Sequence, residues 1–223
     1  LIESGFCDAA VVGGVDSLCL MTIRGFGSLD LLARTPCAPF DSERCGISLG
    51  EAAGFALVER PGPATDGAAI RLVGVGSSGD AHHMSAPDPR GHGAQLALGR
   101  ALEHAGLAPR QIGYVNLHGT GTALNDASED AAVAAVFGTT TPCSSIKGWT
   151  GHTLGAAGIV NVVVSTLALR EGFLPRNLNL QQRDPALRSH ILEQSEHRAI
   201  DNVMVNSFGF GGNNCSLVLA RPR

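Results

Sequence analysis

Short runs of apolar residues alternate along this chain with segments in which apolar positions recur every three or four residues. The runs predict buried strands, and the longer period predicts helices. The chain opens on what we expect to be the last turn of a helix, at 1–5, which Gly5 ends as a C-terminal cap. A fully buried strand at 8–14, a helix at 17–32 and a loop at 35–48 are predicted next.

The remaining pattern is that of an α/β protein. Further helices are predicted at 91–105, 128–137 and 154–169, and further strands at 54–59, 70–75, 112–117, 143–146, 203–207 and 215–220. Strands that alternate with helices pair in parallel through right-handed crossovers, and ligands bind beyond the carboxyl ends of such strands. The last two strands flank a glycine-rich loop and are expected to form a hairpin. A domain boundary is possible near 61–66, without a separately folding unit.

Composition narrows the class of protein. Among 223 residues, 44% are hydrophobic, only 4% are aromatic and 29 are glycine, so the core is expected to consist of small aliphatic side chains in close-packed elements. A net charge of -4 without any basic run argues against nucleic-acid binding. No apolar run reaches the roughly 20 residues that span a bilayer, and no export signal is present. We expect a soluble, cytoplasmic protein with no membrane span.

The cysteines do not form a recognisable ligand set. They are scattered and therefore predicted to be buried, reduced thiols: Cys7, Cys19, Cys37, Cys45, Cys143 and Cys215. His82 and His83 beside Asp80 suggest a metal site, but adjacent residues on a strand point in opposite directions and no third ligand is evident. Neither a metal nor a cofactor is expected.

Two histidines lie in glycine-threonine settings. His118 lies in LHGTGT at 117–122, and His152 lies in KGWTGHTLGAAG at 147–158, five residues after Lys147. Two imidazoles and an ammonium group brought together can polarise a carbonyl and stabilise an enolate. Taken singly, each motif is also compatible with a structural histidine, or with a packed helix start beside a surface lysine. Together they favour an active site.

Two further features accompany the histidines. Phe208 and Phe210 lie in a glycine-rich loop, which is either a mobile gate on an apolar channel or a tight hairpin whose rings fill the core. Asp126 and Glu129 are either an acid pair in the site, or a helix cap at Asp126 and a supporting hydrogen-bond acceptor at Glu129.

These motifs occur in an order that resembles one known family. CDAAVVGGVD at 7–16, PFDSER at 39–44, GEAAG at 50–54, DAHHM at 80–84, both histidine motifs and NSFGFGG at 206–212 are similar to the C-terminal half of β-ketoacyl-acyl-carrier-protein synthases of the KAS I/II type, in the thiolase superfamily. The resemblance implies a layered αβαβα thiolase-like fold, mostly its C-terminal half. Residues 1–60 would be the tail of the N-terminal half and 61–223 the C-terminal half.

The family resemblance also implies a reaction. A cysteine takes an acyl group, and malonyl-acyl carrier protein loses CO2 and attacks that acyl thioester, in fatty-acid or polyketide synthesis. By motif, His118 and His152 hold the thioester oxygen, and Lys147 supplies charge. Thr120 and Thr122 hold the pantetheine arm. Phe210 helps to complete the oxyanion hole, and Phe208 opens or closes access to the site. Acyl carrier protein or coenzyme A thioesters are the implied partners. The assembly would be a homodimer, or a heterodimer with another ketosynthase subunit.

The family's nucleophile is missing from this sequence. None of the cysteines has its strand-to-helix setting, and the matching position precedes Leu1. The sequence is therefore part of a longer polypeptide, or one of two chains, or a non-catalytic remnant; we favour the first and expect the sequence alone to be inactive. A partner subunit resembling a chain-length factor, and a thiolase using Cys215, remain alternatives. Asn161 stands where the family often has glutamate, which affects the pairing of Lys147.

Overall fold

A mixed six-stranded sheet forms the centre of the computed structural model, which describes residues 1–62 and 69–222. The strand order is β3-β10-β9-β4-β5-β7, with bounds β3 Arg71–Gly79, β4 Tyr114–Asn116, β5 Pro142–Ser144, β7 His190–Ile191, β9 Asn202–Gly209 and β10 Asn213–Ala220. The four strands from β9 to β7 are parallel, whereas β10 pairs antiparallel with both β9 and β3. The predicted hairpin of the last two long strands is confirmed, and the predicted parallel pairing holds for the inner strands.

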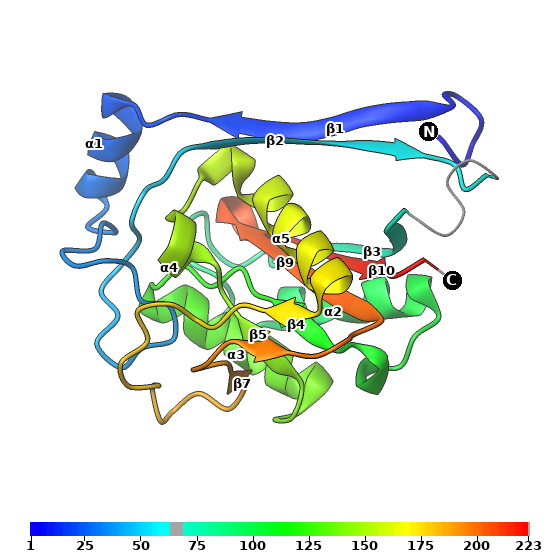
Figure 1. Cartoon of the computed structure of the whole chain (residues 1–223). Coiled ribbons are helices and arrows are strands. Elements are labelled where there is room, and N and C mark those ends of the chain that lie inside the picture. Colours follow the sequence, from blue (N-terminus) through cyan, green and yellow to red (C-terminus); the bar gives the residue numbers. More distant parts are fainter. Residues whose placement is uncertain (63–68, 223) are drawn as a thin grey trace.

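Helices cover both faces of this sheet (Figure 1). On one face α2 (His92–Ala105) packs against β3 and β10, and α3 (Ala123–Phe137) packs against α2. On the other face α5 (Ala157–Glu171) packs against β9. A two-stranded antiparallel ribbon of β1 (Ala9–Asp16) and β2 (Ala52–Glu59) covers α5 from outside. The resulting order of helix, sheet, helix and ribbon confirms the predicted layered α/β class.

The ribbon corrects one prediction. We predicted a fully buried first strand, but Val11 is 72% exposed and Val15 is 61% exposed. The register sets Val11 opposite Leu57 and Gly13 opposite Phe55, so these side chains share one face of the ribbon. None of the described residues covers that face. An apolar run shows that a strand is suited to burial, but it does not show which of its two faces another element covers.

Shorter elements complete the chain: α1 Leu20–Ser28, η1 Pro109–Gln111, α4 Lys147–Thr150, η2 Leu154–Ala156, β6 Phe173–Leu174, β8 Glu196–His197 and η3 Phe210–Gly212. The helix predicted at 17–32 is only α1, which contains Gly25 and Gly27 and has no buried residue to stabilise it. The structure has a hydrogen-bonded turn at 1–5 rather than a helix, but Gly5 ends it as expected, with a φ of 75° and a bond from the Phe6 N–H to the Leu1 carbonyl. The boundary considered near 61–66 lies mostly outside the described residues.

The start of α3 was also predicted wrongly. The helix begins at Ala123 rather than at 128, because the Thr122 hydroxyl accepts the Asn125 N–H and caps it. Thr122 is therefore the capping residue, and Asp126 lies in the first turn.

One helical stretch is apolar enough to cross a membrane by length and composition alone. It runs over Leu154–Glu171, with 18 residues and a mean hydropathy of 1.4. In this fold α5 contacts β9 on one side and β2 on another. That packing is typical of a core helix between two layers of sheet.

Candidate active site

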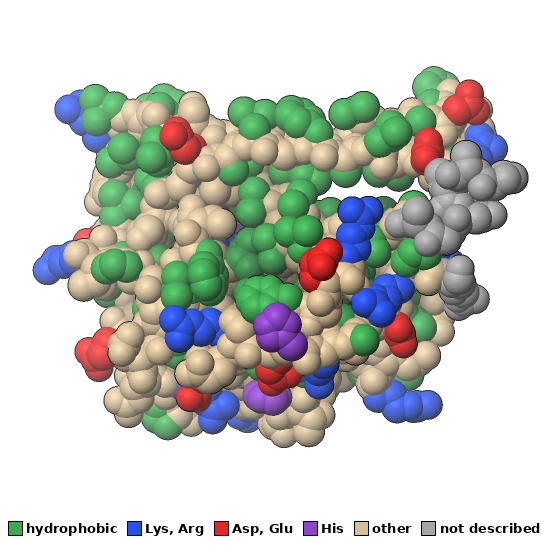
Figure 2. Space-filling model, viewed as in Figure 1, with side chains coloured by type: hydrophobic (Ala, Val, Ile, Leu, Met, Phe, Trp, Pro, Cys, Tyr) green, Lys and Arg blue, Asp and Glu red, His purple; other side chains and the backbone are tan. Residues whose placement is uncertain are grey.

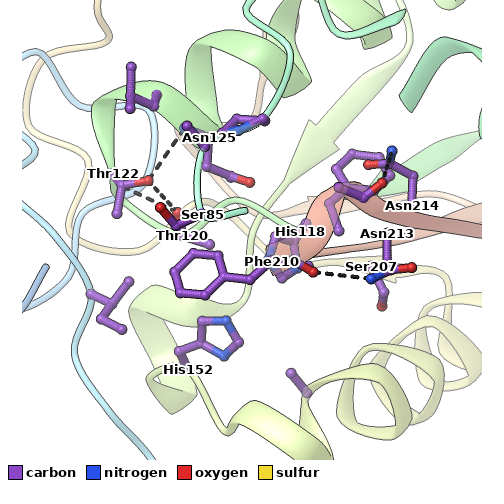
Figure 3. Close-up of a pocket in the computed structure, with 18 of the residues that line it drawn as sticks. Ser85, His118, Thr120, Thr122, Asn125, His152, Ser207, Phe210, Asn213 and Asn214 are labelled. Carbon is purple, nitrogen blue, oxygen red and sulfur yellow. Dashed lines mark hydrogen bonds between the residues drawn. The ribbon is translucent and has the colours of Figure 1, made fainter. Parts of the chain in front are cut away.

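The predicted site residues converge at one end of the central sheet. His118 follows the carboxyl end of β4, His152 follows α4, and Phe208 lies near the end of β9. They border a cavity of about 1200 Å³, and Figure 3 shows both histidines and Phe210 among the side chains that line it. Six of the residues predicted for the histidine site line this cavity: His118, Thr120, Thr122, His152, Phe208 and Phe210.

The two imidazole rings are neighbours. Their centroids are 5.4 Å apart and their planes cross at 80°. The predicted meeting of rings from two distant loops is confirmed. Whether they act on a substrate stays a prediction.

The tautomer of each ring follows from its contacts. The Nδ1 atom of His152 accepts the backbone N–H of Leu154 at 3.1 Å, so it carries no proton. The Nδ1 atom of His118 lies 3.4 Å from Nζ of Lys147, which also donates to the His118 carbonyl. Both rings therefore carry their proton on Nε2. Each ring therefore has one N–H donor, and both rings line the same cavity.

Burial decides the charge of these groups. It lowers the pKa of His152 to about 3 and lowers that of His118 well below the usual value, with the Lys147 charge adding to both effects. Burial also lowers the pKa of Lys147, against the opposing attraction of Glu129. Both imidazoles are therefore neutral near pH 7, and each can donate one hydrogen bond.

Two buried carboxylates support the loop that carries His118. Glu129 accepts the backbone N–H groups of His118 and Gly119 at 2.8 and 2.7 Å, and the amide of Asn206 at 3.0 Å. Asp126 accepts the N–H of Thr120 and of Phe40. Both carboxylates lie behind the loop and outside the cavity lining. This placement matches the expected support by Glu129, but Asp126 binds the preceding loop instead of capping the helix.

The remaining predicted residues line the mouth and walls of the cavity. The hydroxyls of Thr120 and Thr122 are 2.9 Å apart. The Phe208 ring lies 6.1 Å from that of His118 and also packs against the main core cluster. Phe210 is 51% exposed and lies 6.2 Å from Phe26. The roles predicted for these four residues, in holding pantetheine and in gating, stay predictions.

Several contributors were not found from the sequence. Asn206 is fully buried in β9 and binds Glu129; a polar residue inside a predicted strand was the available signal. Leu154 has a φ of 44°, and Asp16 accepts the backbone N–H of Gly155. Both residues lie in the quoted motifs, but nothing in the sequence indicated these contacts. Cys215 lines the same cavity, but burial raises the pKa of its thiol, which disfavours it as a nucleophile.

Comparison with known proteins gives one consistent family. A model described as "Beta-ketoacyl synthase, C-terminal domain" matches residues 69–181, and its N-terminal counterpart matches 1–64. A mitochondrial 3-oxoacyl-[acyl-carrier-protein] synthase of Arabidopsis thaliana is 40% identical over 99% of this chain and 52% of its own length. A 3-oxoacyl-[acyl-carrier-protein] synthase 2 of Coxiella burnetii is 36% identical over 99% of this chain and 57% of its own length. The chain spans about half the length of these relatives.

Solved structures agree with the sequence relatives. A chain in the complex of the ketosynthase ApeO with its chain length factor ApeC, from Xenorhabdus doucetiae, superposes with a TM-score of 0.93 at 49% identity, over 99% of this chain and 55% of that one. A β-ketoacyl synthase from Burkholderia phymatum gives a TM-score of 0.90 at 34% identity, over 100% of this chain and 57% of that one. These likenesses confirm the predicted thiolase-like architecture.

Proposed function

Because this chain belongs to the β-ketoacyl synthase family, we propose that the complete protein catalyses the decarboxylative Claisen condensation of an acyl thioester with malonyl-acyl carrier protein. The product is a lengthened acyl chain for fatty-acid or polyketide synthesis. The nucleophilic cysteine is supplied from outside this chain. The division into 1–60 and 61–223, and a cytoplasmic location, belong to the same proposal.

The chemistry follows from the donor pair. As malonyl thioester loses CO2, the electrons of the broken C–C bond form an enolate, whose charge develops on the thioester oxygen. The rings of His118 and His152 line the same cavity, and we propose that their Nε2–H groups stabilise that oxygen. The carbanion then attacks the acyl thioester on the external cysteine, so that a C–C bond forms, the C–S bond breaks and the cysteine thiolate leaves. Lys147, behind His118, adds positive potential without lining the cavity.

A single observation carries this proposal: two neutral imidazoles whose Nδ1 atoms are both occupied lie 5.4 Å apart on one cavity. The alternative is a non-catalytic partner subunit resembling a chain-length factor. A subunit without chemistry has no need of a buried and a half-buried imidazole backed by a buried lysine and glutamate, so the enzyme is favoured. Among similar structures are a ketosynthase with its chain length factor and one with an acyl-carrier protein. We infer that the complete protein binds acyl carrier protein and pairs with a second ketosynthase subunit, identical or not.

The test is decarboxylation of malonyl-acyl carrier protein by the complete protein. We expect His118→Ala and His152→Ala each to lower the rate by about 10²- to 10³-fold, the usual loss when one oxyanion donor is removed. His190→Ala, an exposed histidine on β7, is the matched control and should leave the rate unchanged. Unchanged turnover in both active-site variants would exclude the proposal. A complete protein that has no cysteine in the family's setting and no decarboxylase activity would favour the partner subunit.

A further inference from the structure

The loop that carries His152 contains a strained residue. Leu154 has a φ of 44°, in the left-handed region that leucine rarely adopts, at a cost of order 1 kcal/mol. Its backbone N–H is the group that occupies Nδ1 of His152. Its side chain lines the cavity, where a glycine would leave a gap. The unusual backbone is therefore tied to the tautomer of the ring two residues earlier.

A carboxylate from a distant strand holds the next residue. Oδ2 of Asp16, the last residue of β1, accepts the backbone N–H of Gly155 at 2.9 Å. These residues are 139 positions apart in the chain. The end of β1 also approaches this turn closely, because a Cβ atom on Gly14 would collide with the Gly155 carbonyl.

The other side of His152 is fixed by the segment before β2. The His152 N–H donates to the Ser48 carbonyl at 2.7 Å, and the Gly50 N–H donates to the His152 carbonyl at 3.0 Å. These bonds hold the backbone of His152 but do not touch Leu154 or Gly155. Within the turn, the Ala156 N–H donates to the Thr153 carbonyl and the Ala157 N–H donates to the Leu154 carbonyl. Among the described residues, Asp16 supplies the side-chain bond that reaches this turn from a distant segment.

We propose that Asp16 is a positioning residue, whose carboxylate holds the strained turn at Leu154 and thereby keeps the proton of His152 on Nε2. Without this acceptor, the turn relaxes toward ordinary backbone angles and the Leu154 N–H leaves Nδ1. The ring then samples both tautomers and is aimed at the substrate oxygen for only part of the time. The inference rests on the proposed function for its kinetic consequence, but not for its structural one.

The structural test is ¹⁵N NMR of the histidine rings in the complete protein. In wild type, Nδ1 and Nε2 of His152 should give the widely separated shifts of one fixed tautomer. In Asp16→Ala the two shifts should move toward each other. Glu51→Ala is the matched control: its carboxylate accepts the Leu18 N–H near the same end of the ribbon and makes no bond to the His152 turn. Unaltered His152 shifts in Asp16→Ala would overturn the proposal, whatever the activity.

The kinetic test uses malonyl decarboxylation with a rescue. Asp16→Ala should lower kcat about tenfold with little change in KM, as loss of a supporting hydrogen bond commonly does. Asp16→Asn keeps an acceptor oxygen and should retain most of kcat. Leu154→Gly removes the strain, so adding Asp16→Ala to it should cost much less than in wild type. An equal cost in both backgrounds, or an Asn variant as impaired as Ala, would overturn the mechanism. An inactive wild type would instead count against the proposed function.

Discussion

Each imidazole in the site is held in one proton arrangement by an atom of its surroundings. Nδ1 of His152 is occupied by a backbone N–H, and Nδ1 of His118 lies beside an ammonium group. Burial keeps both rings neutral, which suits a pair that donates to an oxyanion. At the scale of the residue, the hydrogen bonds that the site can donate depend on which nitrogen of each imidazole carries the proton.

The depressed pKa of His152 predicts a pH dependence of stability. Its folded pKa is about 3, against about 6.5 when unfolded, so the unfolded chain binds more protons below pH 6.5. The stability contribution is complete above pH 6.5 and is lost as the pH falls from 6.5 toward 3. Between pH 7 and 5, the free energy of unfolding should therefore fall by about 1 to 2 kcal/mol more in the complete wild-type protein than in His152→Ala.

Urea unfolding of both proteins at pH 7 and pH 5 measures this difference. His104→Ala, at an exposed histidine in the last turn of α2, controls for the loss of a histidine as such. An identical acid-side loss in wild type and His152→Ala would contradict the assigned burial of the ring.

At the scale of elements, helix α2 lies unusually close to strand β3. The two pack directly because β3 carries glycine where the helix crosses it. A Cβ atom on Gly76 would collide with the Ala97 carbonyl and come within 2.5 Å of the Ala101 nitrogen. Small residues at these positions set the spacing between helix and sheet.

Gly76→Ala should therefore destabilise the protein by about 1 to 3 kcal/mol, because a methyl group in a filled interface forces backbone to shift. Gly79→Ala in the same strand is the matched control, since nothing lies within 4 Å of its added methyl. Chemical denaturation of the two variants separates the effects. Equal midpoints would show that the helix moves away at little cost.

At the scale of the whole molecule, one face of the β1–β2 ribbon is apolar and open. Val11, Val15, Phe55 and Leu57 are each more than 60% exposed, and Figure 2 shows hydrophobic side chains along the ribbon. A contiguous apolar face of this kind promotes association in water.

The 223-residue chain made by itself should consequently self-associate and bind the dye ANS. Replacing Phe55 and Leu57 together by lysine should reduce both effects, because charges on an exposed strand oppose edge and face pairing. Light scattering and dye fluorescence measure the change. Lysines at Leu96 and Leu124, exposed on α2 and α3, serve as the matched control and should leave association largely unaltered. A chain that is monomeric without the substitutions would contradict the prediction.

The sequence by itself determined the class of fold and which residues form the candidate site. Periodicity predicted α2 almost to the residue, because an amphipathic helix and its glycine stop are local properties of the chain. The motifs around His118 and His152 predicted that the two rings share one site, and their resemblance to the β-ketoacyl synthase family supplied the donor role that we propose for them.

Tertiary structure alone decided how those donors are held. The bond from Asp16 to Gly155, the strain at Leu154 and the open face of the ribbon all depend on segments far apart in sequence. A pattern of residues predicts which side chains of an element can be buried or can bind a ligand. Which partner it meets depends on how the layers pack, and packing joins positions whose separation along the chain carries no signal.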